Sequence, residues 1–178
     1  MTLDATMPMR GTDNDGTAEG HSASSVERWL DPCDIQLDVD VRDRRQALEI
    51  TAEAIWRMHG LDQESVLRAL WRRELVGSTA IGCGVAIPHA RIEGITQPAV
   101  LYLRAKTPID FAAPDAKPVR HILAIVVPAD GDDEAHLQLL AALASMMTER
   151  AFRERLAAAE DPREIRRAFA EFGGAAVR

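Results

Sequence analysis

The stretch PAVLYLRAKTPIDFAAPDAKPVRHILAIVVP, residues 98–128, contains the two apolar runs that decide the fold. These runs are PAVLYLRA (98–105) and RHILAIVVP (120–128), and both are rich in β-branched and large apolar residues. Nearly continuous apolar runs bounded by prolines are typical of strands that are covered on both faces. The sequence therefore predicts two central strands, joined by a proline-punctuated connection over residues 106–118.

Helical periodicity lies on both sides of this pair of strands. Gly60 is a plausible helix stop and Asp62 a candidate N-cap, while Pro162 suits a first helical position. IQLDV (35–39) has the alternation of a short edge strand, and a glycine-rich turn leads into the apolar VAI (85–87). The predicted helices cover residues 44–60, 62–76, 133–147, 149–159 and 162–172. This order predicts an α/β fold: a single domain with a mixed β-sheet flanked by helices.

The boundaries of the domain follow from composition. Residues 1–27 are rich in Gly, Ser, Thr and Asp and carry few large apolar groups, so we expect a flexible N-terminal tail. Residues 28–172 form the predicted domain, and 173–178 a short C-terminal tail.

The composition also excludes several classes of function. A formal net charge of −7 over 178 residues gives no global positive field for nucleic acid or an anionic bilayer, so neither is an expected partner. The longest strongly apolar run, residues 122–127, is far too short to cross a membrane, which takes about 20 residues. The polar first residues lead us to expect no export signal, and two cysteines are too few for a disulfide framework. We therefore expect a soluble, cytoplasmic protein without membrane insertion.

Two of the five histidines are candidates for chemistry. His89 follows a proline at the end of an apolar strand that is entered through glycines, which would hold the imidazole rigidly. His136 lies early in a helix and shares the apolar stripe of that helix. Each histidine alone is more simply a hydrogen-bonded structural residue. We expect a structural role for His121, and for His59 a favourable interaction with the C-terminal dipole of its helix. As a pair beside a glycine-rich turn and a helix N-terminus, His89 and His136 indicate an anion site.

Several familiar motifs can be set aside. Gly77 and Gly82 have the spacing of a phosphate-binding P-loop, but Cys83 and Gly84 stand where Lys and Ser or Thr are required. The spacing of the His and Cys residues matches no metal-binding motif, and we expect neither a metal nor a cofactor. A thiol-hydrolase dyad of Cys83 and His136 remains a distant alternative, without a recognisable family signature.

Three separated motifs, taken together, resemble a known family. They are RRELVGSTAIGCGVAIPHA (72–90), TPIDFAAPDAKPV (107–119) and ILAIVVPADGDDEAHLQLLAALA (122–144). In collinear order, from about Trp29 to Phe172, they resemble the type-2 enzyme IIA domain of the bacterial phosphotransferase system (PTS). This family includes the fructose- and mannitol-type IIA domains and the nitrogen-type regulatory IIA proteins. The resemblance implies a mixed sheet flanked by helices.

The resemblance also implies a phosphohistidine site. His89, in IPHA, matches the phosphoryl-accepting histidine of the family, and His136, in AHLQLL, matches its second active-site histidine. Arg73 matches an active-site arginine, although Arg72 beside it leaves the register ambiguous. A neutral imidazole attacks phosphorus without a strong base, and the phosphoryl oxygens call for cations and hydrogen-bond donors. Ser78 and Thr79 could add hydroxyls, and the amides of the glycine turn further donors, although simple turn chemistry explains Ser78 and Thr79 equally well.

Within the family, a short chain with neither a transmembrane segment nor a second domain is most like the nitrogen-type regulatory IIA proteins. The resemblance implies a histidine phosphocarrier protein as the phosphoryl donor and regulation of protein targets by phosphorylation-dependent binding. In the first alternative, the chain is a sugar-transport IIA component that passes phosphate from His89 to a IIB component. In the second alternative, it is an interaction module that accepts no phosphate.

Overall fold

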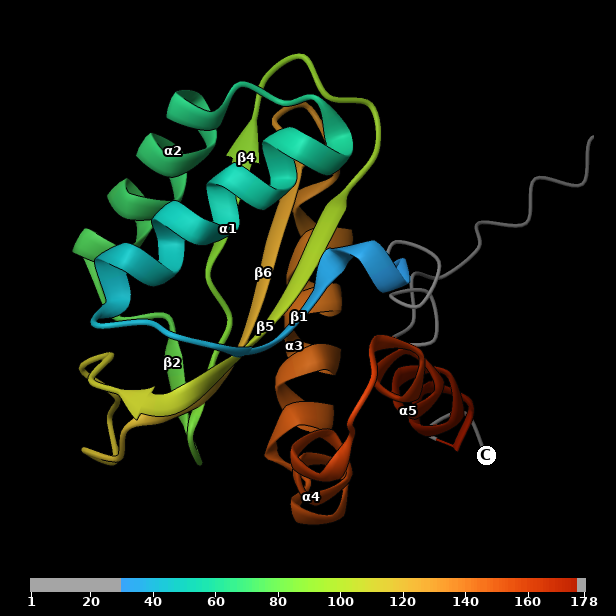
Figure 1. Ribbon diagram of the computed structural model, residues 1–178. Helices are drawn as coiled ribbons and strands as arrows, with labels where there is room; N and C mark the ends of the chain where they lie inside the picture. The colour runs from blue at the N-terminus through green and yellow to red at the C-terminus, as the bar shows by residue number, and fades with distance from the viewer. Residues whose placement is uncertain (1–29, 176–178) are drawn as a thin grey trace, which may run out of the picture.

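The computed structural model describes residues 30–175, so the predicted N-terminal tail (1–27) and the last three residues lie outside the described part. It has a three-layer arrangement in which a central sheet is covered by helices on both faces (Figure 1). In chain order the elements are the 3₁₀ helix η2 (Pro32–Asp34), β1 (Ile35–Val39), α1 (Arg44–His59), α2 (Gln63–Val76), β2 (Ala80–Gly82), β3 (Val85–Ala86), β4 (His89–Ile92), β5 (Ala99–Ile109), β6 (Val119–Pro128), α3 (Asp133–Thr148), α4 (Arg150–Ala158) and α5 (Pro162–Ala175).

The sheet is mixed, as the sequence predicted. Its strand order is β1-β5-β6-β3-β2, with β4 also paired to β6. The two apolar runs form β5 and β6, which pair in antiparallel fashion at the centre, and β1 lies at an edge, parallel to β5. The predicted mixed α/β fold is confirmed.

Helix ends follow local capping chemistry. The carboxylate of Asp62 accepts a hydrogen bond from the Ser65 amide at 2.8 Å, which caps α2 as predicted. At the end of α1, Gly60 takes a left-handed φ of 70°, a conformation that suits glycine. Helix α5 begins at Pro162 as predicted but runs to Ala175, three residues beyond the expected end at Phe172.

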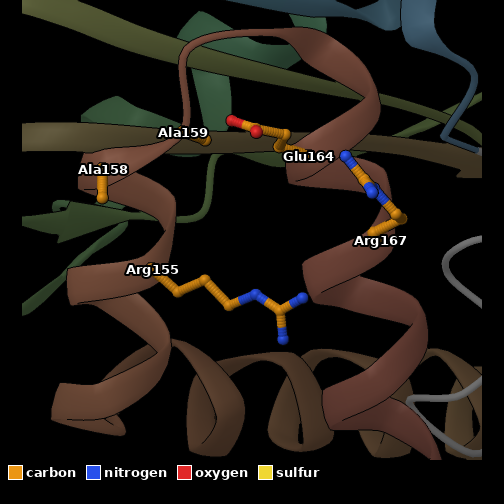
Figure 2. Close-up of a pocket in the computed structure, with 5 residues that line it drawn as sticks. All are labelled: Arg155, Ala158, Ala159, Glu164 and Arg167. Carbon is orange, nitrogen blue, oxygen red and sulfur yellow. The ribbon is translucent and has the colours of Figure 1, made fainter.

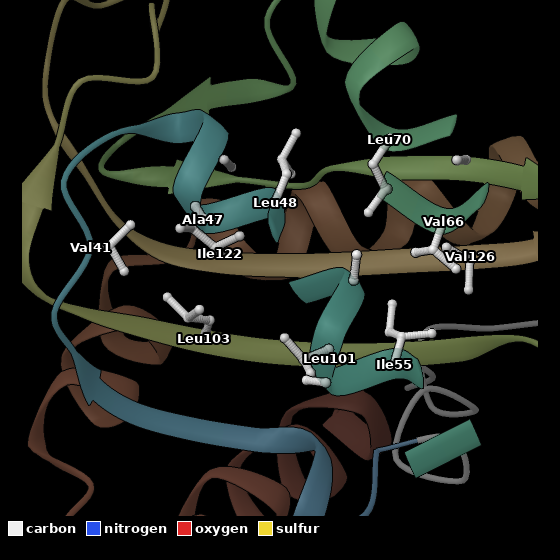
Figure 3. Packing of buried hydrophobic residues seen from close by; sticks show 14 of the residues in the cluster. Val41, Ala47, Leu48, Ile55, Val66, Leu70, Leu101, Leu103, Ile122 and Val126 are labelled. Carbon is white, nitrogen blue, oxygen red and sulfur yellow. The ribbon is translucent and has the colours of Figure 1, made fainter. Parts of the chain in front are cut away.

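Alternation along β5 and β6 divides the apolar residues between two cores. One face of the sheet packs against α1 and α2 through Leu101, Leu103 and Ile122, as Figure 3 shows. The other face packs against α3, α4 and α5 through residues that include Val100 and Tyr102. Both central strands are therefore buried on both faces, which explains their continuous apolar sequence.

Two strand boundaries differ from the prediction. Strand β5 does not end at residue 105 but continues to Ile109, with an irregular register against β6 after Arg104. The apolar VAI does not form one strand that ends before the histidine. Instead β3 stops at Ala86, Ile87 and Pro88 interrupt the pairing, and a new strand begins at His89 itself. Proline has no N–H to donate and thus breaks the ladder.

β3 and β4 lie one after the other along β6. Val85 is opposite His121, and four residues later His89 is opposite Ile125, both in parallel register. The carbonyl of Pro88 also accepts a hydrogen bond from the Ile125 amide at 2.9 Å. His89 is therefore anchored to a central strand immediately after a break in the edge pairing. None of the helices within residues 30–175 is long and apolar enough to cross a membrane.

Arg104 joins the sheet to the C-terminal helices. Its side chain is almost completely buried, and its Nε and NH2 groups donate to the two carboxylate oxygens of Asp38 at 3.0 and 2.6 Å. Its NH1 group donates to the carbonyls of Leu156, Ala157 and Ala159 at the end of α4. One guanidinium thus satisfies carbonyls that the helix leaves without a partner.

We predict that Arg104→Met lowers the free energy of unfolding by about 2–4 kcal/mol, because the buried carbonyls and Asp38 lose their donor. Urea unfolding followed by circular dichroism measures this change. Lys106→Met is the matched control on the same strand: its ion pair with Asp40 is exposed and 3.7 Å long, so we expect a change within about 0.5 kcal/mol. Equal losses in the two variants would contradict the special role of Arg104.

Candidate functional site

The imidazole of His89 is held by backbone that lies two residues earlier in the chain. Its Nδ1–H donates to the carbonyl of Ile87 at 2.8 Å. Because a carbonyl oxygen can only accept, the proton of neutral His89 lies on Nδ1 and the lone pair on Nε2. The backbone thus selects one tautomer of a half-buried histidine.

Arg73, in the last turn of α2, reaches the free nitrogen of this imidazole. Its Nε–H donates to Nε2 of His89 at 3.1 Å, and its NH1 group donates to the carbonyl of Gly77 at 2.8 Å. Arg72 also lies at the edge of the cavity, but the hydrogen bond to His89 comes from Arg73. The geometry therefore resolves the ambiguity between the two arginines in favour of Arg73.

His136 lies next to His89 at the same cavity. It lies in the first turns of α3, and the two imidazole centroids are 5.8 Å apart with a tilt of 58°. The Nδ1 atom of His136 is buried and has no hydrogen-bond partner among the described residues. An imidazole without a fixed partner can adopt either tautomer, so it can donate to an incoming ligand.

These side chains surround a cavity of about 400 Å³. Three arginines lie at it in a chain whose formal net charge is −7, so the site is locally basic in an acidic protein. Such a site attracts an anion with several oxygens, and guanidinium groups match its geometry. The lining residues are Ala69, Arg72, Arg73, Val76, His89, Ala90, Arg91 and His136.

Both histidines have lowered pKa values. Burial is the main cause for His89, whose pKa falls below 6.5 although the Ile87 carbonyl and the charge of Glu74 act in the opposite direction. The charge of Arg73 lowers it further. Burial also lowers the pKa of His136, followed by the charges of His89 and Arg91. Both imidazoles are consequently neutral near pH 7, which leaves the lone pair of His89 available.

The hydroxyls of Ser78 and Thr79 are engaged elsewhere. Ser78 Oγ donates to the carbonyl of Phe111 at 2.5 Å, and Thr79 Oγ1 donates to the carboxylate of Glu74 at 2.6 Å. Neither residue is among those that line the cavity. The structure thus brings His89, Arg73 and His136 together but not Ser78 and Thr79. Ser78 Oγ also accepts from the Ala80 amide, which favours the turn-chemistry interpretation of Ser78.

The amides expected to help bind an anion also have other partners. The Cys83 N–H donates to Asp115 Oδ2 at 2.9 Å, so the turn around Cys83 is occupied by a carboxylate of the chain itself. At the N-terminus of α3, the side chain of Asp132 accepts from the Glu134 amide. Cys83 does not line the cavity with His136, so the structure gives no support to a thiol-hydrolase dyad.

In two other cavities among the described residues, several of the polar groups already have partners. A cavity of about 320 Å³ lies between α4 and α5, with two arginines and Glu164 at its walls (Figure 2). Arg155 there pairs with Glu171 at 2.6 Å, and Glu164 accepts from the Glu160 amide. A third cavity contains His59, whose Nε2 lies 2.9 Å from Asp34 Oδ1. Within residues 30–175 no group of three His, Cys, Asp or Glu side chains could hold a metal ion.

Comparison with known proteins identifies the family. The family described as "Phosphoenolpyruvate-dependent sugar phosphotransferase system, EIIA 2" matches residues 29–172. The chain belongs to this family. The resemblance inferred from the three sequence motifs is therefore confirmed.

Individual relatives of this IIA domain carry two kinds of name. A "Nitrogen regulatory protein" from Klebsiella oxytoca is 37% identical over 136 residues, which cover 76% of this chain and 83% of the relative. A "PTS system fructose-specific EIIA component" from Haloferax volcanii is 37% identical over 110 residues, covering 62% and 71% of the two chains. The crystal structure of the nitrogen regulatory protein IIA-Ntr from Neisseria meningitidis superposes with a TM-score of 0.77 at 33% identity, covering 81% of this chain and 98% of that one.

Arg91 is a residue of this IIA domain's site that the sequence analysis missed. It lies in β4, two residues after His89, and donates to the carbonyls of Ala129 and Gly131 at 3.3 and 2.9 Å. It also pairs with Asp133 at 2.6 Å. Arg91 thus fixes the loop that leads into α3 and hence the approach of His136. Its place two residues after His89, on the same face of a strand, was a signal that the sequence did contain.

We predict that His89 titrates with a midpoint below 6.5 and that Arg73→Gln raises this midpoint, because a cation and a donor to the neutral ring are both lost. Nitrogen-15 NMR of the imidazoles over a pH series measures it. Arg68→Gln is the matched control on the same helix, since Arg68 is exposed and pairs with Glu64. A midpoint that does not change in Arg73→Gln would contradict the observed contact.

Proposed function

We propose that this chain is a nitrogen-type regulatory IIA protein that accepts a phosphoryl group on Nε2 of His89 from a histidine phosphocarrier protein. Its targets would then bind according to whether His89 carries phosphate. The family and the relatives named nitrogen regulatory proteins support this assignment. The phosphoryl chemistry rests on the geometry of His89, and we expect it to take place in the cytoplasm.

One observation carries the proposal: the hydrogen bond from His89 Nδ1 to the Ile87 carbonyl. It leaves Nε2 unprotonated at the cavity, where the lone pair can attack phosphorus. In the transfer, a bond forms between Nε2 and phosphorus while the bond from phosphorus to the carrier histidine breaks, and the carrier nitrogen keeps the electron pair. His89 retains its Nδ1 proton, and the Ile87 carbonyl stabilises the positive charge that develops on the ring.

Donors around Nε2 suit the three phosphoryl oxygens of the transition state. The guanidinium of Arg73 already donates to Nε2 of His89 at 3.1 Å. A small movement would let it donate to a phosphoryl oxygen instead. Arg72 adds positive charge at the cavity, and His136 offers an N–H. The site supplies positions and charges, which are what phosphoryl transfer requires of a protein.

The surface near the cavity suits a protein partner. Val76 lines the cavity and is 83% exposed, and Leu137, next to His136, is 64% exposed. Exposed apolar side chains beside a polar reactive centre are typical of docking surfaces. Phosphorylation would add about two negative charges among these contacts and so change which partner binds.

The second candidate function keeps the chemistry and changes the acceptor. The relative from Haloferax volcanii is named a fructose-specific EIIA component, and at 37% identity this favours a sugar-transport role as the alternative. In that case His89 would pass its phosphoryl group to a IIB component.

We predict that wild-type protein incubated with radiolabelled phosphoenolpyruvate, enzyme I and the phosphocarrier gains acid-labile, base-stable label, and that His89→Ala gains none. His136→Ala should be labelled about 100-fold more slowly, since it lacks one donor to the phosphoryl oxygens. His59→Gln is the control, because His59 lies outside the cavity and pairs with Asp34.

The pattern of label separates the three functions. Label that stays on His89 in the presence of a IIB component and sugar supports the regulatory function. Stoichiometric loss of label to a IIB component and then to sugar supports the transport function. A folded wild-type protein that takes up no label, beside a working positive control, would leave a binding module that accepts no phosphate.

A further inference from the structure

A buried carboxylate lies directly beside Arg73 in the sequence. The side chain of Glu74 is 1% exposed, and its Oε2 atom accepts two hydrogen bonds from Thr79: 3.0 Å from the amide and 2.6 Å from the hydroxyl. Its Oε1 atom lies 3.5 Å from Arg44. Burying a carboxylate is costly unless it is hydrogen-bonded, so this group is held in place by specific contacts.

The residue that Glu74 holds is connected to the backbone that orients His89. The carbonyl of Thr79 accepts a hydrogen bond from the Ile87 amide at 3.0 Å. The carbonyl of the same Ile87 accepts from Nδ1 of His89 at 2.8 Å. A row of hydrogen bonds therefore runs from Glu74 through Thr79 and Ile87 to the imidazole.

The same short segment also holds Arg73. The carbonyl of Gly77, two residues before Thr79, accepts from Arg73 NH1 at 2.8 Å, while Arg73 Nε donates to Nε2 of His89. Segment 77–79 thus contacts Arg73 directly and is connected to His89 through Ile87. Glu74 fixes the end of this segment, although it lines no part of the cavity.

We propose that Glu74 is a positioning residue: by clamping Thr79, it holds the Ile87 carbonyl against His89 Nδ1 and the Gly77 carbonyl against Arg73. This inference rests on the proposed function, because it gives the clamp a purpose in phosphoryl transfer. Glu74 acts as a hydrogen-bond acceptor here. Glutamine keeps an acceptor oxygen, so Glu74→Gln should largely keep Thr79 in place. Alanine has no acceptor, so Glu74→Ala should not.

The test compares Glu74→Ala and Glu74→Gln with wild type in two measurements. Nitrogen-15 shifts of the unphosphorylated imidazole report which His89 nitrogen carries the proton. We expect Nδ1–H alone in wild type and Glu74→Gln, and a mixture of tautomers in Glu74→Ala. The initial rate of labelling from the phosphocarrier should fall about 10- to 100-fold in Glu74→Ala, as small misplacements of reacting groups do. It should stay within about threefold in Glu74→Gln.

Two further variants keep the test decisive. Thr79→Val removes only the hydroxyl contact to Glu74, so it replaces Glu74→Ala in the test if that variant does not fold. We expect smaller changes of the tautomer and of the labelling rate, in the same direction. Glu49→Ala is the matched control, because Glu49 is an exposed carboxylate that pairs with Arg45 on α1. Loss of thermal stability in the folded Glu74 and Thr79 variants, with tautomer and rate as in wild type, would overturn the proposal. Absence of label on wild type would instead refute the proposed function, while the tautomer measurement would still decide whether Glu74 positions His89.

Discussion

The hydrogen bond between the Ile87 carbonyl and His89 Nδ1 is the contact on which the rest of the site depends. Strand β4 continues the line of β3 along β6, and Pro88 interrupts the ladder between them. At this interruption the Ile87 carbonyl meets a side chain. Arg73 can donate to Nε2 only because the carbonyl has already placed the proton on Nδ1. A break in a strand thus determines the chemistry of the imidazole.

Electrostatics and burial act together at this position. Removal from water disfavours the imidazolium of His89, and so does the charge of Arg73, so the two effects lower the pKa of His89 in the same direction. Arg73, which would attract a phosphoryl group, therefore also helps to keep the nucleophile neutral. In an acidic chain, the nearby carboxylates must not cancel this positive charge. Each of Asp115, Asp133 and Glu74 already accepts from a specific donor of the chain.

Much of this architecture could be predicted because it follows from local rules. The apolar runs gave the central strands, and Asp62, Gly60 and Pro162 marked helix ends through capping and backbone preference. The three residues matched to the family motif meet at one cavity. Pro88 is a local signal for a break, but local patterns could not show that a two-residue strand before it and a new strand from His89 both pair with β6, which is distant in sequence.

The hydrogen-bond partners of Ser78 and Thr79 could not be predicted from local sequence patterns either. Their hydroxyls are used by the Phe111 carbonyl and by Glu74, and only the folded chain brings Phe111 within reach. Glu74 itself left a signal: Val66, Leu70 and Glu74 recur every four residues and are the buried side chains of α2. A carboxylate on the buried stripe of a helix requires donors, so this spacing indicates a polar contact inside the fold.

The two histidines need not have the same role before and after transfer. In the unmodified protein, burial and the neighbouring charges lower the pKa of His136, and its Nδ1 has no partner among residues 30–175. A phosphoryl group on His89 would place about two negative charges close to this ring, and a nearby anion raises the pKa of an imidazole. Transfer itself would then favour protonated His136, which has two N–H donors. The residue that is neutral while the phosphoryl group arrives would become a cation that retains it, so one pair of rings serves both states of the protein.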